Sequence, residues 1–444
     1  MPSRIVFNQR ESSLRSGRQL GIELQPQSHL FPNGTTIDLM DTALTHTIGF
    51  LVVAILVAII ARRMRLPYTV GLVLTGIGLA ATGLETGAML THDFIFDVIL
   101  PPLLFEAALS IYWRELQRDM LPVVVLSTLG VVISAVVVAA GLVEFLAWPA
   151  APAVVFGVLI AATDPIAVLA MFKDTGIKGR LRLLVESESL FNDGVAAVLF
   201  ALVLAWAQAT DVGQLTATAV PRALALTTGG GILVGLACGG AGIALAGRTS
   251  DHLVEAALTA VAAYGSFLLA ESLHCSGVLG TVAAGLLMGN LGVLREDERL
   301  NIFSPDGRSF VIGLWEFAAF IANSLIFLLI GLKVSAMPIT GIISSGALLI
   351  AIGLVLVGRA LTVYPLCLLF RHSTWDIPIH EQHVLWWGGL RGALALALAL
   401  ALPPTFPLYN EILITTFGVV VFSVVVQGLT MPLLLRKLSL LPKK

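Results

Sequence analysis

Long apolar runs recur along almost the whole chain, and they limit its possible folds more than any other feature. A helix that crosses a bilayer needs about 20 apolar residues, and runs of about this length repeat from residue 44 to residue 435. Only 12% of the 444 residues are charged, 57% are hydrophobic, and the mean hydropathy is +0.93. Soluble domains have about 25% charged residues, so a soluble enzyme is excluded. We expect an all-α polytopic membrane protein.

The runs also predict the organisation of the chain. Thirteen of them, bounded by charged residues, glycines or prolines, lie at about 44–61, 68–84, 94–112, 121–143, 152–172, 183–208, 223–247, 252–271, 277–293, 311–334, 340–369, 384–402 and 411–435. They predict about 13 transmembrane helices in one membrane domain over 44–435. Residues 1–43 are expected to form a polar, disordered tail, and residues 436–444 a short basic tail.

The basic residues predict the orientation. If the connections after odd-numbered runs are cytoplasmic, these connections and the C-terminus contain eighteen Lys and Arg residues, whereas the opposite loops contain only Arg222. Cytoplasmic loops are enriched in Lys and Arg. We therefore expect the N-terminus outside the cell and the C-terminus in the cytoplasm.

Two probable helix breaks occupy equivalent places if the chain is divided as six helices, one linker helix and six helices. Ala162–Pro165 interrupts the fifth run, and Gly388–Gly392 interrupts the twelfth. Inverted repeats with broken helices at matching places are typical of secondary transporters, which bind their substrate near the bilayer midplane. We expect a 6+1+6 inverted repeat with helices 5 and 12 broken.

Acidic side chains at membrane depth are costly and are candidates for function. Those that qualify are Glu106, Asp164, Glu186, Glu188 and Asp193. Any one of them taken alone has about even odds of only pairing with Arg359 or Arg391 to hold the bundle together, but their clustering favours a functional site.

The sixth run contains the most informative cluster. Ser189 and Asp193 are four residues apart and share a helix face, while Glu188 and Asn192 share the adjoining face. Their oxygen atoms suit a hard cation such as sodium. A carboxylate removed from water takes up a proton more readily, so proton and cation can compete for Asp193 near neutral pH.

The break in the fifth run has its own chemistry. Pro165 lacks an N–H group, and Asp164 before it is suited to cap the second half-helix, so the hydroxyl and carbonyl of Thr163 would face a cavity. A plain proline kink with a capped end is an equal alternative. In the twelfth run, Arg391 would suit the free carbonyls of a half-helix, and Glu188 is its natural partner. Arg359 has no partner that the sequence identifies.

Several other classes are excluded by composition and motifs. The net charge of -2 argues against nucleic acid, and three scattered cysteines predict neither disulfides nor a metal site. His380 and His383 are three residues apart, which is not the zinc-protease spacing. No nucleotide-binding pattern is present, so we expect no cofactor, no enzymatic activity and transport driven by a gradient.

Three motifs together resemble the monovalent cation:proton antiporter-1 family, which includes the NhaP-type sodium/proton antiporters. They are Ala161-Ala162-Thr163-Asp164-Pro165-Ile166-Ala167-Val168, Glu188-Ser189-Leu190-Phe191-Asn192-Asp193-Gly194 and Gly388-Gly389-Leu390-Arg391-Gly392-Ala393. The resemblance covers residues 44–435. It implies a homodimer in which dimerisation and core bundles are interleaved, and a six-helix core that moves in an elevator-like step.

The resemblance also implies roles for particular residues. The sodium or lithium site would be formed by Asp193, Asp164, Ser189, Thr163 and Glu106. Glu188 and Arg391 would form a structural ion pair, and Asn192 beside Asp193 is similar to the electroneutral branch of the family. A prokaryotic inner membrane is the expected location.

Three rival functions remain open at this point. A potassium/proton exchanger could use the same oxygen ligands, and a cation channel would need no protonatable carrier. An intramembrane protease would use the aspartates, but its usual Gly-x-Gly-Asp setting is absent.

Overall fold

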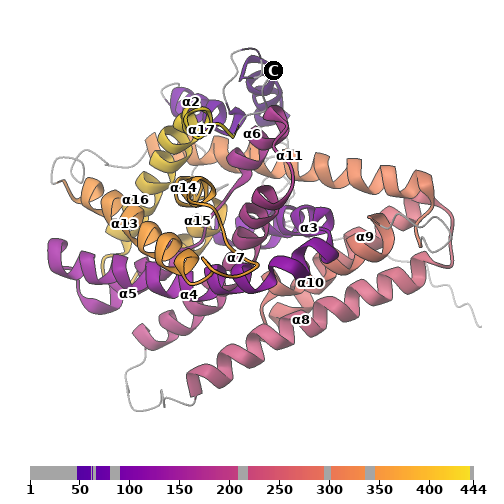
Figure 1. Cartoon of the computed structure of the whole chain (residues 1–444), viewed down its shortest axis with the longest axis horizontal. Helices are drawn as coiled ribbons and strands as arrows, with labels where there is room; N and C mark the ends of the chain where they lie inside the picture. The colour runs from indigo at the N-terminus through magenta and orange to yellow at the C-terminus, as the bar shows by residue number, and fades with distance from the viewer. Residues whose placement is uncertain are drawn as a thin grey trace, which may run out of the picture. The chain divides into compact units, whose positions relative to one another are not determined.

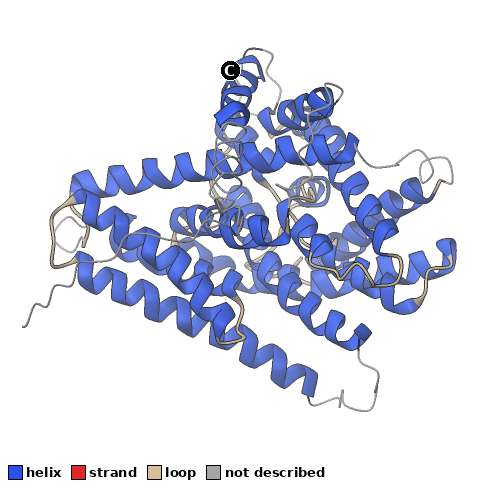
Figure 2. Cartoon of the chain, turned by 180° about the vertical axis from the view of Figure 1, so that it is seen from behind, coloured by secondary structure: helices blue, strands red, loops and turns tan. Residues whose placement is uncertain are grey.

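The computed structural model describes residues 48–61, 63, 67–80, 91–208, 219–294, 302–335 and 346–440. All regular structure within these ranges is helical (Figure 2). Residues Gly49–Lys444 form one compact unit, to which the description below refers. The predicted polar tail at 1–43 lies outside the described residues, as do residues 441–444 of the predicted basic tail.

Seven described helices are long and apolar enough to cross a membrane by length and composition. They are α4 (Trp113–Leu146), α7 (Arg180–Gln208), α8 (Ala219–Ala246, apolar from Arg222), α9 (His252–Ser272), α11 (Pro305–Ser335), α13 (Ala347–Leu368) and the continuous segment α16 (Tyr409–Phe422), η5 (Ser423–Gln427) and α17 (Gly428–Lys437). The count of thirteen spans and the inverted repeat stay predictions.

Shorter helices lie between the long ones. They are Ile48–Ala61, α2 (Tyr68–Ala80), η1 (Phe94–Ile99), α3 (Leu100–Ser110), α5 (Ala150–Leu159), α6 (Ile166–Thr175), α10 (Gly277–Met288), η3 (Gly289–Val293), α14 (Ile379–Trp387) and α15 (Ala393–Leu400). Each of the elements η1, η3 and η5 is a π-helical turn that continues directly into or out of an α-helix.

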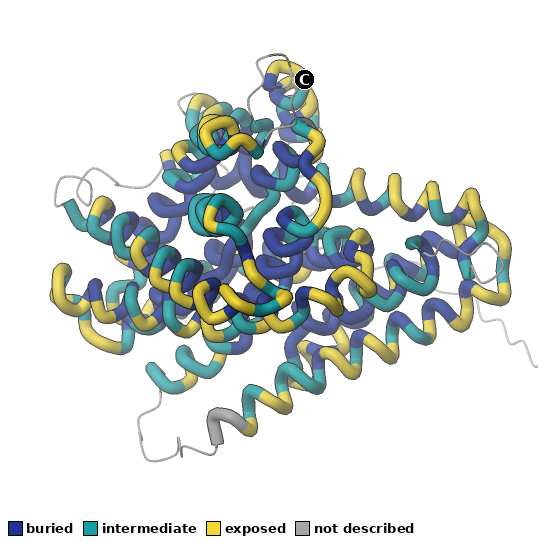
Figure 3. The backbone as a smooth tube through the Cα atoms, in the orientation of Figure 1, coloured by how far each residue is buried: buried dark blue, intermediate teal, exposed yellow. Residues whose placement is uncertain are grey.

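The outer faces of the long helices carry large apolar side chains. Val136, Val261 and Leu349 are 61%, 68% and 69% exposed, and Figure 3 shows exposed positions alternating with buried ones along the long helices. Such apolar surface is unfavourable in water, whereas helices can present it to lipid because their backbone groups are bonded internally. The chain is an integral, multi-pass membrane protein.

The helices pack in two groups. In one, α4 packs against α5, α7 and α13, while α13 packs against α14 and α16. In the other, α10 packs against α3, α8 and α9, while α11 packs against α2, α3 and α9. Figure 1 shows α8, α9 and α10 together on one side of this unit and α4, α5 and α13 on the other. The first group contains both helix breaks.

Both predicted breaks are present. Helix α5 ends at Leu159 and α6 begins at Ile166, while α14 ends at Trp387 and α15 begins at Ala393. The two non-helical segments touch, because the Asp164 N–H donates a hydrogen bond of 2.7 Å to the carbonyl of Leu390. Four half-helix ends therefore meet inside the protein.

Candidate functional site

Asp164 and Gly392 form the closest approach between the two breaks. A Cβ atom on Gly392 would lie 2.0 Å from Asp164 Oδ2 and 2.3 Å from Asp164 Cβ. These distances are far below van der Waals contact, so a glycine is required for the segments to cross here.

The Asp164 carboxylate lies at the N-terminal ends of two half-helices. Its Oδ1 accepts a hydrogen bond of 3.1 Å from the Ile166 N–H at the start of α6, and the Ala393 N–H at the start of α15 also donates to the carboxylate. Helix N-termini carry partial positive charge and free N–H groups, which stabilise an anion. Asp164 therefore binds the first N–H group of the second half-helix as predicted, although the N-cap position itself is occupied by Pro165.

The C-terminal ends of the other two half-helices are each covered by an arginine. Arg391 Nη1 donates to the carbonyls of Ala161 and Ala162 after α5, at 2.6 and 3.1 Å. Arg359 on α13 donates to the carbonyl of Leu385 in α14, through Nη2 at 3.1 Å and Nε at 3.3 Å. Free carbonyls at a helix C-terminus favour a positive charge. All four ends at the crossing therefore meet a group of opposite charge.

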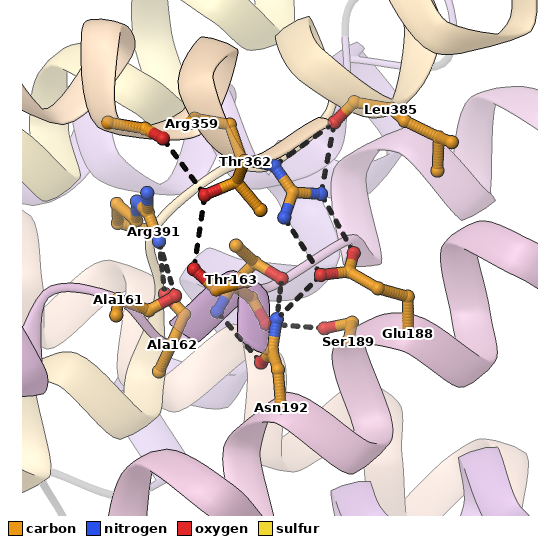
Figure 4. A network of polar contacts seen from close by, with 12 residues as sticks. Ala161, Ala162, Thr163, Glu188, Ser189, Asn192, Arg359, Thr362, Leu385 and Arg391 are labelled. Carbon is orange, nitrogen blue, oxygen red and sulfur yellow. Dashed lines mark hydrogen bonds and ion pairs between the residues drawn. The ribbon is translucent and has the colours of Figure 1, made fainter. Parts of the chain in front are cut away.

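The predicted ion pair between Glu188 and Arg391 is wrong, because Glu188 pairs with Arg359. Arg359 Nη1 and Nη2 lie 2.8 Å from Glu188 Oε1 and Oε2, respectively, and the two side chains are 7% and 3% exposed (Figure 4). The physical reason is that the Arg391 guanidinium is turned to the carbonyls after α5, while α13 presents Arg359 to the carboxylate on α7. This pairing also supplies the partner for Arg359 that the sequence did not identify.

Asn192 joins the ion pair to the first break. Its Nδ2 donates to Glu188 Oε1 at 3.2 Å and to Thr163 Oγ1 at 2.6 Å, while its Oδ1 accepts from the Thr163 N–H at 3.2 Å. The Ser189 hydroxyl donates to the Thr163 carbonyl (Figure 4). Thr163 is thus held in an irregular backbone segment by two side chains of α7.

Asp193 differs from these neighbours. Its Oδ1 is buried and has no hydrogen-bond partner within the described residues. It lies one turn after Ser189 on α7 and lines a cavity of about 100 Å³. This volume has room for several water molecules or a partly hydrated monovalent cation.

The cavity brings together most of the predicted site. Its lining includes the predicted residues Glu106, Thr163, Asp164, Ser189 and Asp193. Asn192 is not part of the lining and lies behind it, bonded to Thr163. The structure therefore groups these six residues as predicted, while their roles remain to be tested.

A second, larger cavity of about 700 Å³ adjoins the first. The two share Glu106, Glu186 and Asn323 in their linings. Glu186 accepts a hydrogen bond of 3.0 Å from the Ser110 hydroxyl and pairs with Arg182 at 3.5 Å. Sequence reasoning missed Asn323, although a polar residue within the apolar segment 311–334 was a signal.

Among the described ranges, no group of three or more His, Cys, Asp or Glu side chains gathers closely enough to hold a metal ion. An ion in the cavity would instead meet carboxylates together with hydroxyl, carbonyl and amide oxygens.

Comparison with known proteins identifies the class. The family described as "Sodium/hydrogen exchanger, transmembrane" matches residues 51–437. Because this family consists of transmembrane exchangers, the match identifies the protein as a membrane transporter. The chain belongs to the sodium/hydrogen exchanger family, and its resemblance to the NhaP-type antiporters is confirmed.

Individual relatives agree with this placement. The Na(+)/H(+) antiporter ApNhaP of Aphanothece halophytica is 41% identical over 383 residues, which cover 85% of this chain and 70% of the relative. The Na(+)/H(+) antiporter NhaH of Halobacillus aidingensis is 34% identical over 408 residues, which cover 88% of this chain and 96% of the relative. These relatives are bacterial, which supports the expected prokaryotic origin.

A solved structure supports the fold. The sodium proton antiporter MjNhaP1 from Methanocaldococcus jannaschii superposes with a TM-score of 0.72 over 91% of this chain and 100% of that chain. The sequences are 21% identical, so this likeness concerns the fold alone.

Proposed function

We propose that this protein exchanges sodium or lithium for protons, with Asp193 as the carrier that holds either the proton or the cation. The observation that carries the proposal is the buried Asp193 Oδ1, which has no partner among the described residues and belongs to a side chain lining the cavity. An unpaired carboxylate oxygen in such a place is costly unless it binds a proton or a cation. The relatives ApNhaP and NhaH are named as sodium/proton antiporters, which supports the same substrates.

The charges at the crossing support a one-for-one exchange. Ionised Glu188, Asp164 and Asp193 contribute three negative charges, and Arg359 and Arg391 contribute two positive charges. Glu186 is balanced by Arg182, and Glu106 on α3 is taken to keep the same protonation state throughout the cycle. The remainder that changes is one negative charge, which one proton or one monovalent cation neutralises. Asn192 bonds to its neighbours but cannot bring a second proton.

The two helix groups support an elevator-like movement. The helix breaks and Asp193 belong to the group of α4, α5, α7 and α13, whereas Glu106 and Asn323 belong to the group of α3 and α11. Movement of the first group against the second would carry the ion from one side of the membrane to the other. We further propose a homodimer in a prokaryotic inner membrane, with the N-terminus outside and the C-terminus in the cytoplasm.

The carrier role is tested with the purified protein in proteoliposomes that contain a pH-sensitive dye. Asp193→Asn should abolish sodium-driven proton movement, because the amide can neither release a proton nor neutralise the cation. The matched control is Asp251→Asn, since Asp251 caps α9 by accepting from the Leu253 N–H at 2.9 Å and asparagine caps equally well. Retained exchange in the Asp193 variant, or equal loss in both variants, would contradict the carrier role.

The cation and the stoichiometry are tested on the unmodified protein. Sodium and lithium should drive proton movement and potassium should not; exchange driven by potassium alone would favour the potassium/proton alternative. Sodium flux without proton movement would favour a channel. An imposed voltage acts on each uncompensated charge with about 2.3 kcal/mol per 100 mV, so one-for-one exchange should reach the same equilibrium at zero and at imposed voltage.

A further inference from the structure

A second buried oxygen without a partner among the described residues belongs to a side chain that lines the same cavity as Asp193. Asn323 on α11 is 6% exposed, and its Oδ1 has no hydrogen-bond partner among the described residues. Buried amide oxygens are almost always hydrogen-bonded, because an unpaired one costs about 1–3 kcal/mol. The unpaired Asn323 oxygen therefore indicates that the adjacent cavity holds a group that binds to it.

Asn323 lies next to both cavities of the site. Asn323 belongs to the linings of both the small cavity and the large one, so it lies where they join. The Tyr68 hydroxyl lies within hydrogen-bonding reach of the Asn323 side chain. This contact engages the Asn323 side chain from α2, while its Oδ1 has no partner among the described residues.

The carboxylates that line the same cavity indicate which kind of ligand binds there. Asp164 and Asp193 line the same small cavity from the group of helices that contains the breaks, and Glu106 lines it from α3. A space bordered by carboxylates and an amide oxygen suits a hard monovalent cation with some of its water. An anion would be repelled there, and an apolar ligand would leave the carboxylates unsolvated.

We propose that the Asn323 amide oxygen is a ligand of the transported cation, contributed by α11 to the cavity that the carrier also lines. Asn323 sets the affinity for the cation and does not carry the proton, because an amide does not titrate. Helix α11 packs mainly on α2, α3 and α9 and has a smaller contact with α16. If the group with the breaks moves against α11, the Asn323 contact exists only while the cavity lies beside α11. Loss of this contact during movement of the other group would help to release the cation. The inference depends on the proposed exchange function.

The test compares Asn323→Leu with the unmodified protein and with Ser324→Ala. Leucine has the same branching at Cγ as asparagine and a larger side chain, so it removes the oxygen without opening a cavity. Ser324 is the neighbouring residue on α11, is 1% exposed and also has an unpartnered hydroxyl among the described residues, but it does not line the cavity. Ser324→Ala therefore controls for loss of a buried polar atom in this helix.

We expect Asn323→Leu to raise the KM for sodium about tenfold, which corresponds to about 1.4 kcal/mol, with little change in maximal rate. Ser324→Ala should leave the KM unchanged. Asn323→Asp, which keeps the oxygen and adds a charge, should lower the KM at alkaline pH. A readout without transport is the rise in thermal stability on adding sodium, which Asn323→Leu should weaken.

The outcomes separate the two proposals. If the unmodified protein shows no sodium-driven proton movement, the proposed function fails. If it does, and neither Asn323→Leu nor Asn323→Asp changes the KM or the sodium-dependent stabilisation relative to Ser324→Ala, then Asn323 is not a ligand. A fall in maximal rate with unchanged KM in both variants would also overturn the inference.

Discussion

The ion pair of Glu188 with Arg359 can be separated from the nearby Arg391 by two double-mutant cycles. The Nη1 and Nη2 atoms of Arg359 each lie 2.8 Å from a carboxylate oxygen of Glu188, and the two side chains are at most 7% exposed. Removing one partner of such a buried pair leaves the other charge without compensation, which costs about 3–5 kcal/mol. The size of the effect depends on what each variant leaves behind.

Each single variant can be placed within that range. In Glu188→Gln the amide oxygen can still accept one bond from Arg359, so we expect a loss near the lower end, about 3 kcal/mol. Arg359→Met removes both bonds to Glu188 and those to the Leu385 carbonyl, so we expect about 5 kcal/mol. The double variant leaves neither charge of this pair behind and should cost no more than the worse single variant. The coupling energy should be about 3 kcal/mol.

The second cycle combines Glu188→Gln with Arg391→Met. Arg391 donates to the carbonyls of Ala161 and Ala162 and makes no ion pair within 4.0 Å in the described part of the chain. Its loss exposes helix-end carbonyls whether or not Glu188 is charged. We expect a coupling below about 1 kcal/mol.

The assay uses a thiol in the same helix as Arg359. Cys367 on α13 is fully buried, whereas Cys238 and Cys275 are partly exposed and are replaced by alanine in the background protein. The rate at which a maleimide dye labels Cys367 in detergent gives the free energy of opening of α13. Strong coupling between Glu188 and Arg391, together with none between Glu188 and Arg359, would refute the pairing derived from the structure.

Two further predictions concern the crossing and its movement. Gly392→Ala should abolish exchange and lower the thermal stability, because its Cβ would lie 2.0 Å from Asp164 Oδ2. The control is Gly353→Ala, which has open space around it and should leave the transport rate and melting temperature nearly unchanged. An active Gly392→Ala protein would contradict the tight crossing. The exposed pair of Lys173 on α6 and Glu316 on α11, at 3.2 Å, joins helices of different groups. Lys173→Cys with Glu316→Cys, linked by a short cleavable reagent, should stop sodium-driven proton movement until the link is reduced, and continued exchange in fully linked protein would exclude relative movement of these helices.

The sequence predicted the helix breaks because they depend on local chemistry. Pro165 lacks an N–H group and the glycines around Arg391 weaken a helix, so both segments favour an interruption. These residue types alone do not force one, since Pro122 and Pro365 lie inside the continuous helices α4 and α13. The grouping of Ser189 with Asp193 also follows from local geometry, since residues four apart share a helix face. Both features are present in the structure.

The partner of Glu188 could not be predicted in the same way. Two arginines, Arg359 and Arg391, are available at membrane depth, and charge alone does not choose between them. The choice depends on how α13 is rotated against α7 and on the carbonyls that the first break leaves free for Arg391. Asn323 was missed for a similar reason, because only the packing of α11 shows that its side chain reaches the cavity.

Most polar groups at the crossing are held by hydrogen bonds to the protein, and this limits the ways in which a bound ion could be released. Thr163, Ser189 and Asn192 bond to one another, and Asp164 is held by the N-terminal ends of α6 and α15. These groups cannot turn away from the cavity without breaking bonds that are buried from water, at about 1–3 kcal/mol for each group left unpaired. Release of a cation by rearranging its ligands would therefore be slow and costly. Movement of the crossing as one body would keep these bonds intact and change the contacts with helices of the other group, among them α3, α8, α10 and α11. On this argument, the proposed elevator-like step would be the less costly route to the other side of the membrane.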